Sequence, residues 1–383
     1  MKILILIPSI TSYYTFLNEV TQELLNHKFD VHLATSPKHL ENIDCYDEEI
    51  NGTYHPITFP RAFNLFQHII SAIKLKRLVY KIQPDIIHAH FFSTIFAMSL
   101  AKVCPSPITI ATFHGLNSPL SHGWRKKLFQ LLERYCISKV TSTWLLNKED
   151  APHIKKLNDN VNIHTSLGIG CPISKLDPAQ FSDPHRKNLK QELGIPAHEF
   201  IFIFIGRQVA HKGFATTVKA FIKLNACNRN CKLLLVGVKD NIHPTGLSKN
   251  EENEVLLHND IIGVGWQKDV QPYLSISDVL VFPSRREGVP VCLMEALAMG
   301  VPAITLNSRG CRDVVRDEID GLIIDEDSPN GVFKGMKRLL DNPNELQKFS
   351  FRANLDRDRF DRKHYVNEQL EIYNNLVQSD IPA

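Results

Sequence analysis

The stretch FPSRREGVPVCLMEALAMGVPAIT, residues 282–305, is the most informative part of this chain. DVLVFPS (278–284) is typical of a buried strand, SRREGVP of its exit loop, and VCLMEALAMG of a helix that ends at Gly300. Pro290 fits the first turn of this helix, where its missing N–H costs nothing. A strand that leads through a short loop into a helix is the repeating unit of a parallel sheet.

The same alternation of short apolar runs and amphipathic stretches predicts two parallel sheets, one in each half of the chain. With 383 residues, the chain is long enough for two cores. LGIGCPISKLDPAQFSDPHRKN (167–188) lacks periodicity and predicts the linker. The fold class is therefore α/β, with two doubly wound Rossmann-like domains, and the natural ligand site is a cleft between them. Strands are expected at 3–7, 30–35, 85–90, 108–113 and 139–144, and then at 200–205, 231–237, 260–265, 278–284 and 302–306.

We place the domain boundaries at 1–180 and 181–357, with a terminal helix over 358–383 that packs toward the N-terminal domain. Net charge is only +3, which suggests neither a nucleic-acid binder nor an acidic tail. MKILILIPS predicts a first buried strand rather than a signal peptide, so we expect a cytoplasmic protein. The eight cysteines lack Cys-x-x-Cys spacing and favour reduced thiols; they are Cys45, Cys104, Cys136, Cys171, Cys227, Cys231, Cys292 and Cys311.

GRQVAHKG (206–213) directly follows the expected strand FIFIFI. Gly206 permits a sharp turn, and Arg207 and Lys212 then stand where free backbone N–H groups point outward. Two cations beside a helix N-terminus indicate a site for a diphosphate. The alternative is a solvated basic loop.

Glu295 is the only charged residue between Glu287 and Arg309, and it lies more than one turn inside an apolar helix. A carboxylate in this position needs hydrogen-bond donors, and the vicinal hydroxyls of a ribose would supply them. The alternative is a structural ion pair with a distant arginine. Glu287 lies one loop away, at the phosphate end, where sugar hydroxyls are expected; otherwise it is a solvated acid.

These two motifs, in this order and spacing, closely resemble glycosyltransferase family 4, whose members are retaining enzymes of the GT-B fold. The resemblance extends from about the linker onward and continues more loosely through DIIHAHFF and ATFHG. It is greatest to bacterial members that build O-antigen, capsule or exopolysaccharide on a lipid carrier. It implies a nucleotide-sugar donor, which we expect to be UDP-linked and to carry an N-acetylhexosamine. It also implies a lipid-linked or growing saccharide acceptor.

The resemblance also assigns roles. Arg207 and Lys212 grip the donor diphosphate, Glu295 binds the ribose and Glu287 bonds the transferred sugar. Further donor-binding residues are Gly206, Gly288, Pro290, the amides of Val289 to Val291, and Trp266 and Gln267 around the base.

In the N-terminal half, His114 follows a strand and precedes a glycine; the resemblance places it near the reacting sugar carbon. His90 either lines the acceptor side or is structural. Many relatives carry a Gly-Gly pair after the first strand, whereas this chain has PSITSYYTF (8–16). This loop is a candidate for the acceptor through Thr11, Ser12 and Tyr13.

We expect no metal or other cofactor, because Arg207, Lys212 and a helix N-terminus already balance the charge of a diphosphate. Asp325-Glu326-Asp327 and Asp356-Arg357-Asp358 imitate a metal motif but lie far from the phosphate residues in sequence.

RAFNLFQHIISAIKLKRLVYK (61–81) and WRKKLFQ (124–130) combine apolar and basic residues, so they favour peripheral contact with the inner leaflet of a cytoplasmic membrane. Ordinary helices packed on a sheet are the alternative. Two other functions stay open: a UDP-sugar 2-epimerase of the same architecture, and a non-catalytic two-domain sugar-binding protein.

Overall fold

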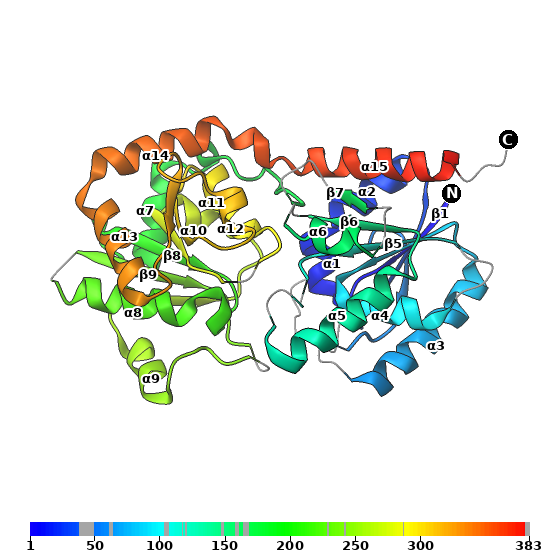
Figure 1. Ribbon diagram of the computed structural model, residues 1–383. Helices are drawn as coiled ribbons and strands as arrows, with labels where there is room; N and C mark the ends of the chain where they lie inside the picture. Colours follow the sequence, from blue (N-terminus) through cyan, green and yellow to red (C-terminus); the bar gives the residue numbers. More distant parts are fainter. Residues whose placement is uncertain are drawn as a thin grey trace. The chain divides into compact units, whose positions relative to one another are not determined.

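The computed structural model describes the chain except for residues 38–49, 61–63, 103–106, 117, 119–120, 147–148, 158–160, 164–167, 228–229, 241–242, 286 and 380–383. Cys45 and Cys104 lie outside the described residues, and the other six cysteines are free thiols. The chain divides into two compact units (Figure 1). Unit 1 comprises Met1–Ile169 and Lys363–Ala383, and unit 2 comprises Gly170–Arg362.

Unit 1 contains a parallel seven-stranded sheet in the order β3-β2-β1-β4-β5-β6-β7. Its strands are β1 (Lys2–Leu6), β2 (Asp30–Thr35), β3 (Thr53–Pro56), β4 (Ile86–His90), β5 (Ile108–Phe113), β6 (Ser142–Leu145) and β7 (Val161–Ile163). Its helices are α1 (Ile10–Phe16), α2 (Asn18–Asn26), α3 (Leu65–Ile82), α4 (Phe91–Ala101), α5 (Gly123–Ile137), α6 (Ala151–Lys155) and α15 (Arg362–Ser379).

Helices cover both faces of this sheet. Figure 1 shows α3, α4 and α5 along one face, and α2 and α15 along the other. The central strands β1 and β4 are buried except at Lys2, as expected for parallel strands with helices on both sides. From α15, Tyr373 donates or accepts a 2.5 Å hydrogen bond with His88 of β4 and packs against Trp144 of β6.

Unit 2 contains a parallel six-stranded sheet in the order β10-β9-β8-β11-β12-β13. Its strands are β8 (Phe200–Ile205), β9 (Cys231–Val236), β10 (Ile261–Gly265), β11 (Val279–Phe282), β12 (Ala303–Leu306) and β13 (Gly321–Ile324). Its α-helices are α7 (Asp183–Glu192), α8 (Phe214–Asn225), α9 (Lys249–Leu257), α10 (Gln271–Ser275), α11 (Val291–Ala298), α12 (Cys311–Val314), α13 (Pro329–Asp341) and α14 (Pro343–Leu355).

The chain order on this sheet reverses at β8, because β9 pairs with one side of β8 and β11 with the other. Right-handed crossovers then place α8 and α11 on opposite faces. The loops that follow β8 and β11 leave the sheet side by side. This is the topological switch point, where ligands bind in open α/β sheets.

The units divide at 169/170 and 362/363, whereas the sequence suggested 180/181 and 357/358. Backbone pairing explains the difference. The amide of Cys171 donates to the carbonyl of Phe360 at 2.8 Å, and the amide of Arg362 donates to the carbonyl of Cys171 at 3.1 Å. Gly170 has a φ of +63°, and a Cβ there would lie 2.7 Å from Cα of Arg362, so the two passes of the chain are in contact. The predicted linker also includes the start of α7.

Candidate functional site

Gly206 directly follows β8 at the switch point of unit 2. Its φ of +150° belongs to the range that favours glycine. Its amide donates to the carbonyl of Val236 at 2.9 Å, and a Cβ would lie 3.5 Å from both the Lys212 and Phe282 side chains. The turn therefore brings the β8 loop close to the end of β11.

Lys212 and Glu287 meet at this point. The Lys212 ammonium donates to Oε1 of Glu287 at 2.8 Å, and the Ser284 hydroxyl donates to the same oxygen at 2.8 Å. The ammonium also lies 5.3 Å from the ring centre of Phe282. The side chains of Lys212 and Glu287 are only 20% and 12% exposed. We call Lys212, Ser284 and Glu287 the switch-point cluster.

Charge in the switch-point cluster is set by two opposing effects. Burial is the largest single effect and lowers the pKa of Lys212, but the charge of Glu287, the nearby Cys292 and the hydrogen bond to Glu287 together raise this pKa above its ordinary value. Lys212 is therefore an ammonium at neutral pH. Arg207 is close enough for its positive charge to lower the pKa of Lys212 slightly, so the two predicted cations do lie near one another.

Arg207 forms an ion pair with Asp240, which follows β9. The Arg207 side chain is half-exposed, whereas Asp240 is 11% exposed. The sequence predicted two cations ready for an anion. In the structure, both cations already have carboxylate partners, so an incoming diphosphate must share or displace them.

Glu295 lies on α11, which begins at Val291 after Pro290 as the N-cap residue. The prediction that Pro290 belongs to the first helical turn is therefore wrong by one position, since its ψ is 118°. The helix stops at Ala298, and Gly300 follows with a φ of +71°.

The carboxylate of Glu295 forms no hydrogen bond or ion pair with any residue that the structure describes. Burial raises the pKa of Glu295 to about 7, and the more distant charge of Arg362 opposes this shift. The side chain is only partly exposed. This is the state expected of a carboxylate whose hydrogen-bond donors come from a ligand.

The N-terminus of α11 offers backbone N–H groups that no side chain caps. Gly288, in the preceding loop, lies against Gly310, because a Cβ at Gly310 would be 2.3 Å from the Gly288 carbonyl oxygen. Gly310 has a φ of +80°, so glycine is required there on both counts. The N–H groups of Val289 and Val291 follow Glu287 of the switch-point cluster closely in the chain, and Pro290 between them has no N–H.

Trp266 and Gln267 follow β10, and both are half-buried. The Gln267 amide donates to the carbonyl of Val264 at 2.7 Å, which fixes the loop. Their predicted role at the base stays a prediction.

In unit 1, His90 ends β4 and His114 follows the neighbouring strand β5. The two imidazoles share a 3.3 Å hydrogen bond between Nδ1 of His90 and Nε2 of His114. His114 is half-buried and stacks on Phe91, with ring centres 3.9 Å apart. Phe91 has a φ of +68°, which is uncommon for a bulky residue and typical of positions where backbone strain is held for a purpose.

His90 is buried, with 1% of its surface exposed, so it supports His114 and does not line an acceptor surface. The sequence left its two roles open, and burial favours the structural one. Its ring centre lies 4.1 Å from that of His88.

The predicted acceptor loop of unit 1 is a helix. Ser9 caps α1 by accepting a hydrogen bond from the amide of Ser12, and the hydroxyls of these two residues are 2.7 Å apart. The role of Tyr13 is wrong, because its side chain is fully buried and its hydroxyl bonds with Thr21 at 2.9 Å. Thr11 and Ser12 are half-buried and stay candidates.

The acidic triplets are engaged in contacts within the protein. Asp327 forms a bidentate pair with Arg285 at 2.5 and 2.8 Å, and Glu326 pairs with Lys334 at 3.0 Å. Asp356 pairs with Arg316 at 2.7 Å. No group of three or more metal-ligating side chains occurs among the described residues.

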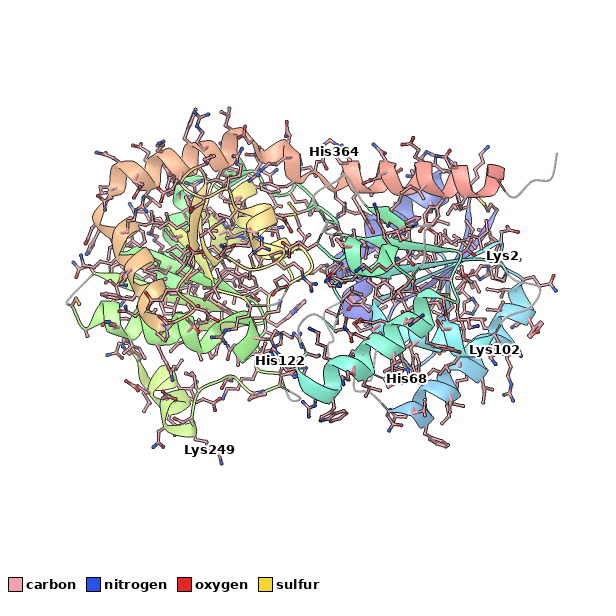
Figure 2. All side chains as sticks on the ribbon, in the orientation of Figure 1. Lys2, His68, Lys102, His122, Lys249 and His364 are labelled. Carbon is pink, nitrogen blue, oxygen red and sulfur yellow. The ribbon has the colours of Figure 1, made fainter. Side chains whose placement is uncertain are left out.

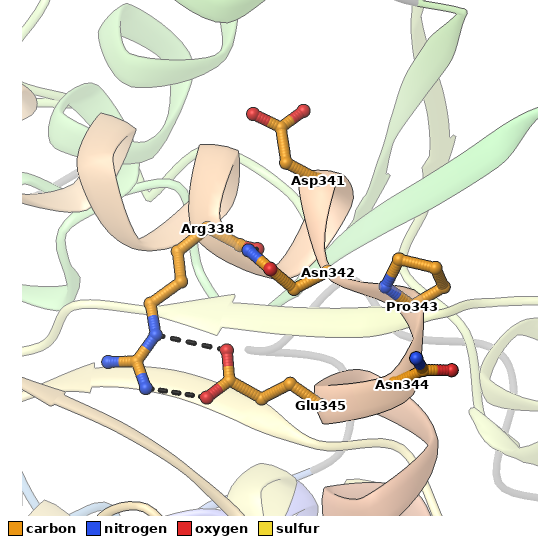
Figure 3. A pocket seen from close by; sticks show the side chains of 6 residues that line it. All are labelled: Arg338, Asp341, Asn342, Pro343, Asn344 and Glu345. Carbon is orange, nitrogen blue, oxygen red and sulfur yellow. Dashed lines mark hydrogen bonds and ion pairs between the residues drawn. The ribbon is translucent and has the colours of Figure 1, made fainter.

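A hollow between α13 and α14 is a separate feature (Figure 3). Arg338 spans it, donating to Glu345 at 2.6 and 3.0 Å and to Glu318 at 2.5 and 2.7 Å. These bonds, first those to Glu318, raise the pKa of Arg338 above its usual range. The hollow contains none of the predicted site residues, and two of the residues that line it, Arg338 and Glu345, pair with each other.

Asp240, Ser284 and Phe91 were missed by the sequence reasoning. Asp240 and Ser284 each follow a strand neighbouring the switch point, which is the signal that could have found them. Nothing in the sequence indicated the unusual backbone of Phe91.

Two protein families match the chain. The family described as Glycosyl transferases group 1 matches residues 185–355, and Glycosyl transferase 4-like matches residues 2–144. Together they span most of both units.

Curated relatives are similar over most of their length. A UDP-Gal:alpha-D-GlcNAc-diphosphoundecaprenol alpha-1,3-galactosyltransferase of Escherichia coli is 28% identical over 84% of this chain and 82% of its own. The capsular polysaccharide biosynthesis glycosyltransferase CapM of Staphylococcus aureus is 26% identical over 84% and 83%. An N,N'-diacetylbacillosaminyl-diphospho-undecaprenol alpha-1,3-N-acetylgalactosaminyltransferase of Campylobacter jejuni is 23% identical over 84% and 85%.

Solved structures share the fold at low identity. A sucrose-phosphate synthase of Thermosynechococcus elongatus matches with a TM-score of 0.80 at 16% identity, over 99% of this chain and 100% of its own. HepE of Anabaena, solved in complex with UDP and glucose, matches with a TM-score of 0.78 at 15% identity, over 98% and 99%.

Proposed function

The chain belongs to glycosyltransferase family 4 and has the GT-B fold, and from this we propose that it transfers a sugar from a UDP-sugar to a lipid-linked saccharide with retention of anomeric configuration. Family membership makes it a glycosyltransferase, and its curated relatives build bacterial surface polysaccharides. The donor, the acceptor and the stereochemistry are the parts that we propose.

One observation carries the proposal: unit 2 holds a charged switch-point cluster together with a carboxylate that lacks a partner among the described residues. A nucleoside diphosphate sugar offers matching groups. Its diphosphate forms ion pairs with Lys212 and Arg207, and its ribose hydroxyls donate hydrogen bonds to Glu295. Its sugar hydroxyls meet Glu287, whose second oxygen remains available beside the one that accepts from Lys212 and Ser284.

Bond cleavage places negative charge on the departing diphosphate. Lys212 and Arg207 stabilise that charge, and the N–H groups at the start of α11 add to it. Since Glu287 is held by Lys212 and Ser284, we assign it to binding the sugar and not to attacking it. The acceptor hydroxyl then attacks from the face that the diphosphate leaves, and the leaving phosphate oxygen takes the hydroxyl proton.

The names of two relatives support the acceptor and the stereochemistry. The relatives of Escherichia coli and Campylobacter jejuni are both named for acceptors linked to undecaprenol through a diphosphate, and both for alpha linkages. An alpha product is expected when an alpha-configured UDP-sugar reacts with retention. UDP-hexoses and UDP-N-acetylhexosamines are therefore the first donors to test, at the cytoplasmic face of the inner membrane.

The experiment is a donor screen in excess EDTA with UDP-, GDP- and dTDP-sugars and GlcNAc-diphosphoundecaprenol as the acceptor. We expect transfer from a UDP-sugar, an anomeric proton coupling that reports an alpha linkage, and no requirement for Mg²⁺ or Mn²⁺. A beta linkage would contradict retention, and activity that returns only with added metal would contradict the metal-free site. Epimerised sugar formed from donor alone would favour the 2-epimerase instead.

A further inference from the structure

Helix α3 of unit 1 has a second apolar face that no described element covers. Its inner face packs on the core through His68, Ser71, Ala72, Leu75, Val79 and Ile82. Its outer face carries six large apolar side chains that are 39% to 72% exposed: Leu65, Phe66, Ile69, Ile70, Ile73 and Tyr80. We call these six residues the α3 stripe.

The spacing makes the α3 stripe continuous. Phe66, Ile69, Ile70 and Ile73 follow the i, i+3, i+4, i+7 pattern of one helix face. His68, labelled in Figure 2, faces the other way, since its ring packs edge-on against Phe96 of α4 at 5.1 Å. Single exposed apolar residues are ordinary, but a contiguous apolar patch marks an interaction surface.

Positive charge accompanies the α3 stripe. Lys74, Lys76, Arg77 and Lys81 are all exposed, and α3 contains no Asp or Glu. None of these four cations forms an ion pair with a residue that the structure describes. The Lys76 ammonium lies 5.9 Å from the ring centre of Tyr80, so charge and apolar surface share one face.

A second helix of the same layer repeats this composition. Helix α5 begins after His122, labelled in Figure 2, with Trp124 at 71% exposure and Leu131, seven residues on, at 65%. Arg125 lies 5.6 Å from the Trp124 ring centre. Helix α4 lies between α3 and α5 and has no exposed residue, so α3 and α5 form the outer surface of this layer (Figure 1).

We propose that the α3 stripe, with the start of α5, docks unit 1 on the surface of an anionic lipid bilayer. The apolar side chains enter the headgroup boundary, and the cations meet the lipid phosphates. The described helices include none that is long and apolar enough to cross a bilayer, so the contact is peripheral. The inference rests on the proposed function, because a lipid-linked acceptor is reached only at a membrane.

Charge complementarity selects this occupant over a second copy of the chain. A dimer through α3 would bring the same acid-free, cationic helix to the interface from both sides, and like charges would lose water without gaining partners. An anionic bilayer supplies the opposite charge over the whole surface.

The first test is flotation of the full chain with vesicles of phosphatidylcholine and phosphatidylglycerol in equal amounts. Phe66→Ser with Ile70→Ser should weaken binding by at least about tenfold, because two apolar side chains no longer insert. The matched control is Leu256→Ser with Leu257→Ser on α9, where leucines of 75% and 82% exposure are lost from unit 2. This control should bind as the unchanged chain does.

The second test separates charge from apolar contact. Lys74→Gln with Arg77→Gln should weaken binding to these vesicles by roughly thirtyfold, since each basic residue at an anionic surface contributes about fivefold. The matched control is Lys187→Gln with Lys348→Gln, two exposed lysines of unit 2, which should have no effect. Vesicles of phosphatidylcholine alone should bind the unchanged chain weakly.

UDP affinity of the same variants distinguishes the two proposals. Lost vesicle binding with unchanged UDP affinity supports the surface. If the unchanged chain binds UDP and transfers sugar but does not float with anionic vesicles, the surface is wrong and the function stands. If it floats but binds no nucleotide, the surface stands and the function fails. If either α3 double variant lowers the sedimentation coefficient without lipid, the stripe is covered by a second copy and the proposal is overturned.

Discussion

The switch points of the two units have the same topology and different contents. In unit 2 the loops after β8 and β11 contribute a lysine, a glutamate and a serine within hydrogen-bond distance. In unit 1 the loop after β1 is a capped helix, and β4 ends in a buried histidine that supports His114. The strand order therefore predicts where a ligand site can lie in each sheet. Whether that site can bind or react depends on side chains that point away from the core.

The largest expected effect is in unit 2. Lys212→Ala should lower UDP affinity by about 1.5–3 kcal/mol, because a charge-assisted bond is lost. It should lower the transfer rate by roughly 10²–10³, the range for a missing donor to developing charge. Calorimetry with UDP and a rate assay measure the two effects.

Lys219→Ala is the matched control. Lys219 pairs with Glu251 at 2.8 Å at the surface of the same unit, and exposed pairs contribute only about 0–1 kcal/mol. If Lys212→Ala binds UDP as well as this control does, the diphosphate role of the switch-point cluster is wrong.

A smaller effect is expected from Glu287→Gln. The change keeps the shape and removes the charge that holds Lys212, so UDP should bind as well as before or better. Transfer should fall by roughly tenfold to a hundredfold, since one charged hydrogen bond to the sugar is lost. Glu326→Gln, in a triplet that pairs with Lys334, is the control and should change neither quantity. Weaker UDP binding by Glu287→Gln would instead show that Glu287 positions Lys212 for the diphosphate.

The smallest effect is expected in unit 1 from Tyr13→Phe. Its hydroxyl bonds with Thr21 and accepts from the amide of Asn51 at 3.0 Å, so unfolding should become easier by about 1 kcal/mol per lost bond. Transfer kinetics should not change, because a fully buried ring reaches no substrate. His114→Ala is the contrast and should slow transfer. A raised KM for acceptor in Tyr13→Phe at unchanged stability would restore the acceptor role.

The interior of both sheets could be predicted from sequence, and three of their edges could not. The strands expected at 30–35 and 108–113 have those bounds in the structure. The missed strands β3, β7 and β13 all lie at sheet edges. These strands have only three or four residues and hydrogen-bond to a neighbour on one side only, so their apolar runs are too short to mark a strand in sequence. β3 is the polar sequence TYHP.

The candidate site divides in the same way. Glu295 could be predicted as a site residue because a single charge in an apolar helix needs an explanation. Gly206 could be predicted because it directly follows a buried strand. Asp240 and Ser284, the partners of Arg207 and Glu287, could not be predicted from sequence. A hydrogen bond between loops depends on how the strands are ordered in the sheet. Ser9 caps α1, but α1 consists largely of β-branched and aromatic residues. These residues have low helix propensity, so the sequence did not predict this helix.

The stability of unit 2 should also depend on Glu295. Because burial raises its pKa to about 7 from an ordinary value of 4.5, the folded chain binds a proton here that the unfolded chain releases. Stability is therefore lost as pH rises between these two values. Glu295→Gln should be the more stable protein above about pH 7, by at most on the order of 3 kcal/mol, and should lose this advantage in acid.

The central claim is that the Glu295 carboxylate binds the ribose hydroxyls of the donor. Uridine binding tests this claim most directly, because uridine contains the ribose and no phosphate. Affinity is measured at about pH 6 and about pH 8, on either side of the pKa of about 7. The unchanged chain should bind uridine up to roughly tenfold more tightly at the higher pH, where the carboxylate is ionised. Glu295→Gln should bind uridine weakly and without this pH dependence. If Glu295→Gln binds uridine as the unchanged chain does and melts at a lower temperature, Glu295 is half of a structural ion pair and the ribose site is contradicted.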